Sequence, residues 1–151
     1  MPARNTMRVL IPACVLLMGA VLAPVSASAQ VAGLRATLIL ASDDPAAQDP
    51  RLDRVEFRLR RIFHFPYYRH YGDGAAAVNL PGEATLRLGH GNDLQIHATD
   101  AKDGRVRAQV RWLRDGNLVL NTTVVMSRGT PVILGGVSQA GGTLIVTLVA
   151  E

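Results

Sequence analysis

Four histidines are the side chains of this sequence best suited to bind a metal ion, namely His64, His70, His90 and His97. Two imidazoles on one helix or strand reach the same ion when they stand two or four residues apart. None of the four has a partner at that spacing, and no acidic residue completes a known ligand pattern beside them. We therefore expect surface or hydrogen-bonded histidines, with no metal site and no cofactor.

Hydroxyl and carboxyl groups also give no catalytic pattern. A nucleophilic serine is often marked by G-x-S-x-G or S-x-x-K, and neither motif surrounds Ser42, Ser127 or Ser138. Asp43 and Asp44 are adjacent acids in a proline-containing loop, a setting typical of solvated turn residues rather than of a general acid and base. The sequence therefore predicts no catalytic residue, and we expect a protein that is not an enzyme.

Arginines recur at alternate positions of several predicted strands, where their side chains are expected to face outward. The four that share this pattern, here called the arginine row, are Arg87, Arg105, Arg107 and Arg111. Side by side they would form a cationic surface for anionic glycans or lipid headgroups. The simpler interpretation is an ordinary soluble sheet face with scattered arginines.

Six of the seven aromatic residues lie between positions 57 and 71. Tyrosine is favoured where one end of the side chain is dry and the other is wet, as at a protein interface. The candidate contact surface for a partner consists of Phe65, Tyr67, Tyr68 and Tyr71. The alternative is that these rings close the end of the hydrophobic core, and the sequence leaves both interpretations open.

Residues 50–63 are expected to form a helix ahead of this aromatic segment. Asp49 can cap its free N–H groups, and Pro50 suits the first helical position. Pro66 then prevents the helix from continuing. Apolar residues recur at three- and four-residue spacing, which gathers on one face Leu52, Val55, Leu59, Ile62 and Phe63.

The arginines of this helix fall on the side away from its apolar face, at positions 51, 54, 58 and 61. The same segment also alternates as a half-buried strand would. The cap, the early proline and the helix-tolerant composition favour the helix. Phe57 is the one residue that a helix leaves unexplained, because it points away from the apolar face.

The rest of the chain consists of short alternating segments separated by turn residues, which predicts about eight strands. They are expected at residues 33–41, 75–80, 83–88, 94–98, 106–112, 118–126, 130–134 and 143–149. Among the glycine-rich segments expected to be turns are Gly72-Asp73-Gly74, Gly89-His90-Gly91, Asp115-Gly116-Asn117 and Gly135-Gly136.

The first and last of these strands are apolar on both faces, as expected of strands in the middle of a sheet or beneath a helix. We therefore expect them to pair with each other. One helix inserted early among strands predicts an α+β fold, in which the helix at about residues 50–63 packs on an antiparallel β-sheet or sandwich of about eight short strands.

Residues 1–29 have the pattern of a secretory signal peptide. Two arginines precede a mostly apolar run, and Ala27-Ser28-Ala29 fits the cleavage rule. The apolar run is too short for a membrane span. Cleavage near Ala29–Gln30 would leave residues 30–151 as a single β-rich domain in the periplasm or outside the cell, with no transmembrane segment.

The only cysteine, Cys14, would leave with this peptide, so the mature chain has no disulfide and no thiol nucleophile. A lipoprotein would need Cys14 as its modified residue, and the nearby Pro12 disfavours that alternative. The mature chain carries 14 basic and 12 acidic side chains. This balance is too even to indicate a nucleic-acid partner.

The last part of the chain, residues 121–151, is similar to the C-terminal strand pattern of the bacterial secretin domain. The matching positions are Thr122, Thr123, Gly129, Pro131, Leu134, Gly135 and Gly136. Secretins are outer-membrane channel multimers, but the periplasmic modules and membrane-spanning hairpins of a secretin have no counterpart in this sequence. The whole chain also resembles small uncharacterised secreted bacterial proteins, which imply no activity.

These patterns together predict an exported, non-enzymatic module that acts by contact with an envelope protein. The secretin likeness indicates an accessory of an export or assembly system. The alternative is a module that binds anionic glycans or lipid headgroups through the arginine row.

Overall fold

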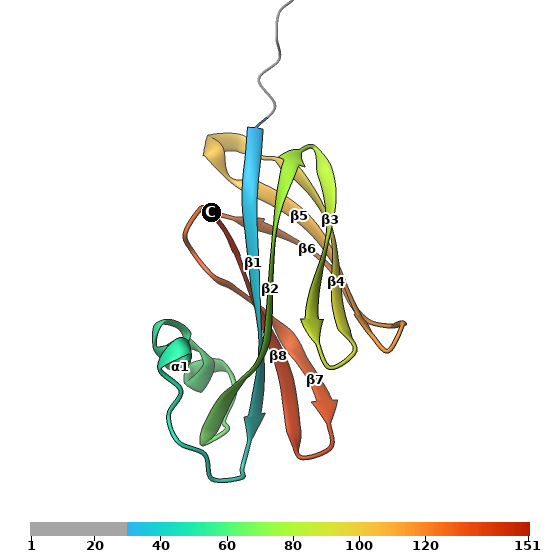
Figure 1. Ribbon diagram of the computed structural model, residues 1–151. Coiled ribbons are helices and arrows are strands. Elements are labelled where there is room, and N and C mark those ends of the chain that lie inside the picture. Colours follow the sequence, from blue (N-terminus) through green and yellow to red (C-terminus); the bar gives the residue numbers. More distant parts are fainter. Residues whose placement is uncertain (1–29) are drawn as a thin grey trace, which may run out of the picture.

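The computed structural model describes residues 30–151, and the predicted signal peptide lies outside the described residues. This part of the chain forms eight strands, one α-helix and two short 3-10 turns (Figure 1). The helical elements are η1 (Pro50–Leu52), α1 (Asp53–Ile62) and η2 (Lys102–Gly104). The strands are β1 (Gln30–Ser42), β2 (Tyr67–Leu80), β3 (Gly82–Gly89), β4 (Asn92–Asp100), β5 (Val106–Arg114), β6 (Asn117–Met126), β7 (Val132–Gln139) and β8 (Gly142–Ala150).

The strands form two four-stranded antiparallel sheets. Sheet A has the order β2-β1-β8-β7, and sheet B has the order β3-β4-β5-β6. Strands β1 and β8 are the central pair of sheet A, with Leu38 opposite Val146. This confirms the predicted pairing of the first strand with the last, and the structure is mostly antiparallel β with one short α-helix.

Sheet A separates two hydrophobic clusters, because β1 and β8 are apolar on both faces. The larger cluster unites the inward side chains of both sheets, with Leu38, Trp112 and Val146 fully buried. The smaller cluster joins the outer face of sheet A, through Ile39 and Ile145, to the helix. Figure 1 accordingly shows α1 on one side of sheet A and sheet B on the other.

The helix begins where the sequence predicts. The Asp49 side chain accepts a hydrogen bond from the backbone N–H of Arg51, and Pro50 is the first helical residue. Leu52 and Leu59 are fully buried, whereas Phe57 is 66% exposed and faces away from the sheet. Among residues 30–151, no helix is long and apolar enough to cross a membrane.

The predicted turn at Gly72-Asp73-Gly74 is wrong, because these residues lie inside β2, which begins at Tyr67. A Cβ on Gly72 would overlap the carbonyl oxygen of Leu88 in β3, and a Cβ on Gly74 would lie 2.9 Å from the carbonyl oxygen of Arg87. Both glycines therefore allow β3 to approach β2 closely rather than reverse the chain.

The predicted turn at Gly135-Gly136 is also wrong. Both residues lie inside β7, where the pairing with β8 shifts register between Leu134 and Gly136. Glycine in a strand commonly marks such a bulge. The glycine-rich turn at residues 89–91 is confirmed, and it connects β3 to β4 with His90 at φ 52°.

Candidate functional site

A groove of about 540 Å³ lies between the helical segment and the outer face of sheet A. Its charged lining consists of Arg35, Arg51, Arg54, Arg58, Asp73 and Glu151. We call it the arginine groove, because four of these six side chains are guanidinium groups. Apolar lining comes from Val55 on the helix and from Val149 on β8.

Helical spacing brings three of the arginines to one side of the groove. Residues 51, 54 and 58 are three and four positions apart, so they share one face of the helical segment, while Leu52 and Val55 on the adjoining face pack against the sheet. The sequence contains this spacing, but it predicted only that these arginines lie on the side of the helix away from its apolar face. Nothing local indicated that sheet A would form the opposite wall.

Strand alternation supplies the other wall. On β1, Arg35 and Thr37 alternate with inward-facing core residues, so both side chains face the helix. The ladder places Asp73 of β2 and Thr147 of β8 on either side of Thr37. Three neighbouring strands thus contribute a polar row to the floor of the groove.

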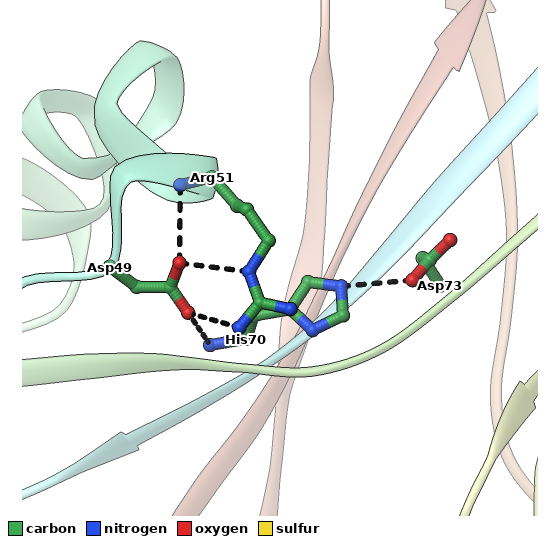
Figure 2. Close-up of polar contacts among 4 residues, drawn as sticks. All are labelled: Asp49, Arg51, His70 and Asp73. Carbon is green, nitrogen blue, oxygen red and sulfur yellow. Dashed lines mark hydrogen bonds and ion pairs between the residues drawn. The ribbon is translucent and has the colours of Figure 1, made fainter.

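Asp49 ties the start of the helix to β2 at one end of the groove, as Figure 2 shows. Its carboxylate accepts hydrogen bonds from Nε and Nη2 of Arg51, at 2.9 and 2.7 Å. The same carboxylate accepts one from the backbone N–H of His70, at 3.3 Å. The hydrogen bond from the Arg51 guanidinium holds the pKa of the Asp49 carboxyl well below its ordinary value.

His70 and Asp73 form the polar pair nearest to this junction. The Nε2 atom of His70 lies 3.0 Å from an oxygen of Asp73, and the His70 side chain is mostly buried. Both residues belong to β2 and are three positions apart. The contact with Asp73 fixes the position of the imidazole at this end of the groove.

The arginines of the groove differ in how far their charge is compensated. Arg51 is held by Asp49 at 2.7 Å, and Arg35 lies 3.3 Å from Glu151. Arg58 donates to the carbonyl oxygen of Pro131 at 3.3 Å. Within residues 30–151, neither Arg54 nor Arg58 forms an ion pair with a carboxylate. These two guanidinium groups are therefore the best placed to bind an anion from outside.

Replacing Asp49 with asparagine is expected to lower the free energy of unfolding by about 0.5–1 kcal/mol near neutral pH, because it removes the charged partner of Arg51 while asparagine still caps the helix. A carboxyl with a lowered folded-state pKa stabilises the fold above its unfolded pKa of about 4 and loses this contribution as the pH falls. Urea unfolding between pH 7 and pH 2 should therefore show a shallower acid-side loss of stability in the variant. An equal loss in both proteins would contradict this role of Asp49.

The predicted aromatic contact residues do not share one surface. Tyr68 is buried in the cluster under the helix, where its hydroxyl donates to the carbonyl oxygen of Phe63 at 2.7 Å. Phe65 is half-buried against the same cluster. Tyr71 instead packs on the core between the sheets, and its ring stacks on His90 at 4.0 Å. Tyr67 is half-buried beside a small hollow near Pro66.

The arginine row is dispersed over sheet B. Arg87 on β3 stands opposite Asp93, whereas Arg107 and Arg111 lie on β5, four residues apart. Arg111 donates to Oε1 of Gln95 at 3.1 Å. Arg105 lies before β5 and donates to the carbonyl oxygen of Lys102. The outer face of sheet B therefore mixes cationic, anionic and neutral groups.

A second hollow of about 550 Å³ lies on this outer face of sheet B. Its lining includes Glu83, Gln95, His97 and Arg111, and the Nδ1 atom of His97 is 3.5 Å from a Glu83 oxygen. Glu83 and His97 are both largely exposed. In the part of the chain that the structure describes, no three His, Cys, Asp or Glu side chains come together as metal ligands.

The arginine groove thus combines concentrated charge with rigid support, whereas the hollow on sheet B has a similar volume but one arginine in its lining. The walls of the arginine groove belong to three neighbouring strands of sheet A and to a helical segment anchored by Leu52 and Leu59. No protein-family model matches the chain, and neither a curated protein nor a solved structure shows significant similarity to it.

Proposed function

We propose that the protein is an exported, non-enzymatic module that binds an acidic, extended segment of an envelope protein in the arginine groove. We further propose that it serves an envelope export or assembly system, in line with the signal-peptide pattern and the secretin-like segment of residues 121–151. Its two sheets, stacked as a β-sandwich, would form the rigid platform. The observation that carries the proposal is the unneutralised charge of Arg54 and Arg58 in a groove with four arginines.

The chemistry of the groove favours carboxylates. Guanidinium groups present planar pairs of N–H donors that match the two oxygens of a carboxylate. Arg54 and Arg58 are four residues apart, about one helical turn, or 5–6 Å along the axis. Acidic side chains at alternate positions of an extended segment have a similar spacing, about 6.6 Å. Two Asp or Glu residues of such a segment therefore match the two arginines.

The apolar part of the lining favours a protein segment over a glycan. Val55, Pro131 and Val149 line the groove beside the arginines, and none of its lining residues is Phe, Tyr or Trp. A peptide can place aliphatic side chains against the valines while its carboxylates reach the guanidinium groups. A sugar would lack the aromatic platform on which its ring commonly packs.

Reversing the charge of Arg54 is expected to weaken binding of a fluorescent Glu- and Asp-rich peptide by about 10- to 100-fold, because hydrogen bonds to charged groups contribute about 1.5–3 kcal/mol. Arg54→Glu tests this in fluorescence anisotropy, and affinity for the unmodified protein should fall as salt is added. Arg107→Glu is the matched control, since it removes the same charge from the exposed outer face of sheet B.

Three results would contradict the proposal. The peptide fails to bind the unmodified protein, or Arg107→Glu weakens binding as much as Arg54→Glu does. The third such result is that vesicles of anionic lipid, or a sulfated glycan, bind the protein more tightly than the peptide does. That result would support a lipid or glycan ligand instead.

A further inference from the structure

Strand β6 is an exposed sheet edge whose pairing with β5 is regular from Leu120 to Met126, after a bulge at Val119. It is the last strand of sheet B, and its ten residues include no charged side chain and no proline. Strands β3, β4 and β5 each carry at least two charged side chains. Three apolar side chains of β6 are conspicuously exposed, namely Leu118, Val119 and Val125 at 49%, 37% and 43%. Natural proteins usually place lysine, proline or a covering element at such an edge.

The other sheet edges are covered or interrupted. Strands β2 and β3 lie against each other, with Gly72 and Gly74 of β2 facing the β3 backbone. Strand β7 is bulged in its middle, at Gly135, and Arg114 donates a hydrogen bond to the carbonyl oxygen of Ser138. Within residues 30–151, no backbone hydrogen bond from outside sheet B reaches β6. Its outer N–H and C=O groups are therefore available to another strand.

We propose that β6 pairs antiparallel with β6 of a second copy of this chain, with Thr122 opposite Thr122 on the two-fold axis. In this register the facing pairs of the regular segment match in kind. The pairs on each side of the axis are Asn121 with Thr123 and Leu120 with Val124, and the bulge at Val119 ends the regular register beyond them. Polar residues meet polar residues and apolar residues meet apolar residues, which is the self-complementarity that a two-fold interface requires.

The inner faces of the two copies of sheet B also lie on the same side in this register. Positions that pair differ by an even number, so inward-facing Leu120 and Val124 remain on the inner face of a continuous eight-stranded sheet. Charge presents no obstacle either. Arg111 of one copy shares a row with Gln109 of the other, three strand spacings or about 14 Å away, which exceeds the screening length in physiological salt.

The absence of charge on β6 argues for a second copy rather than a different partner. A strand that recognised a distinct protein would gain specificity from charged side chains, and β6 carries none. A strand identical to β6 supplies the complementary pattern without any further recognition element. This surface lies on sheet B and is independent of the arginine groove on sheet A.

Placing charge on the two-fold axis gives a direct test. In protein expressed from the full-length sequence, Thr122→Lys and Thr122→Glu should each weaken the dimer by at least about tenfold, because like charges directly opposite each other repel. An equimolar mixture of the two variants should recover dimers, since lysine then faces glutamate. Sedimentation velocity at micromolar concentration measures all three samples, and Thr85→Lys on the exposed outer face of β3 serves as the control that leaves the dimer intact.

A second pair of positions covers the case in which a charge at half-buried Thr122 prevents folding. Asn121 and Thr123 are exposed on the outer face of β6, and the register places them directly opposite each other between copies. Combining Asn121→Lys with Thr123→Lys should weaken the dimer, whereas combining Asn121→Glu with Thr123→Lys should retain it. Wild-type protein that stays monomeric, a mixture without recovery, equal dimerisation of the two double variants, or assembly into open polymers would each overturn the proposal.

Discussion

Gly72→Ala is expected to abolish folding or to lower the free energy of unfolding by more than about 3 kcal/mol. The added methyl group would overlap the carbonyl oxygen of Leu88, which is backbone and cannot rotate away. Relief therefore requires β2 and β3 to separate, and that movement would open the core where the two sheets meet. Typical overpacking costs about 1–3 kcal/mol when side chains can adjust, so a clash with backbone should cost more.

Gly135→Ala is the matched control for this effect. Gly135 also lies within a strand, but a Cβ there has no atom within 4 Å, and its φ is not in the left-handed region. Urea unfolding monitored by the fluorescence of Trp112 should show a nearly unchanged midpoint for Gly135→Ala. Equal stability of the two variants would show that β3 does not approach β2 at Gly72.

Trp112→Phe is expected to lower the free energy of unfolding by about 2–4 kcal/mol, because it creates a cavity and leaves a buried acceptor without a donor. Trp112 is fully buried on β5, and its indole N–H donates to Oδ1 of Asn92 at 3.0 Å. The amide of Asn92 donates in turn to the carbonyl oxygens of Gly89 and His90. The tryptophan therefore supports the turn between β3 and β4 as well as the core.

A double-mutant cycle separates these two contributions. In an Asn92→Ala background the same Trp112→Phe change should cost about 1 kcal/mol less, since the unsatisfied acceptor is already gone. Unfolding in urea, monitored by circular dichroism because the fluorophore is removed, measures all four proteins. Identical costs in both backgrounds would contradict the role of the indole hydrogen bond.

Local patterns were sufficient to predict the elements whose signals lie within a few residues. Asp49 and Pro50 marked the start of the helix, because a cap and an N-terminal proline act through adjacent backbone groups. The apolar pattern on both faces of residues 33–41 and 143–149 predicted a central strand pair, since only a strand covered on both sides buries both faces. These predictions are confirmed.

The two wrong turns show where local reasoning ends. Glycine occurs in turns because its backbone is conformationally free, and it occurs where two strands approach closely because it has no side chain. The sequence alone does not distinguish these two roles. Gly72 is required by a carbonyl oxygen that belongs to Leu88, sixteen residues later. Only the packing of β3 on β2 reveals that contact.

The candidate site was harder to predict than the fold, because it depends on a wall that other segments supply. The spacing of Arg51, Arg54 and Arg58 was visible, but Arg35 reaches the same groove from β1 and Glu151 reaches it from the residue after β8. Outward arginines on predicted strands were expected to lie together, yet β3 and β5 are separated by β4. Strand order, which periodicity does not encode, decides which side chains become neighbours.

The pairing of β1 with β8 has a consequence for the order in which the molecule can assemble during synthesis. Facing residues in this pair, such as Ala41 with Thr143, are more than 100 positions apart, so the pair closes one of the longest loops in the chain. The helix is made early, yet Ile145, on which it packs, is made more than 80 residues after the end of α1. A nascent chain that stops short of residue 142 therefore lacks β8 and has no completed groove.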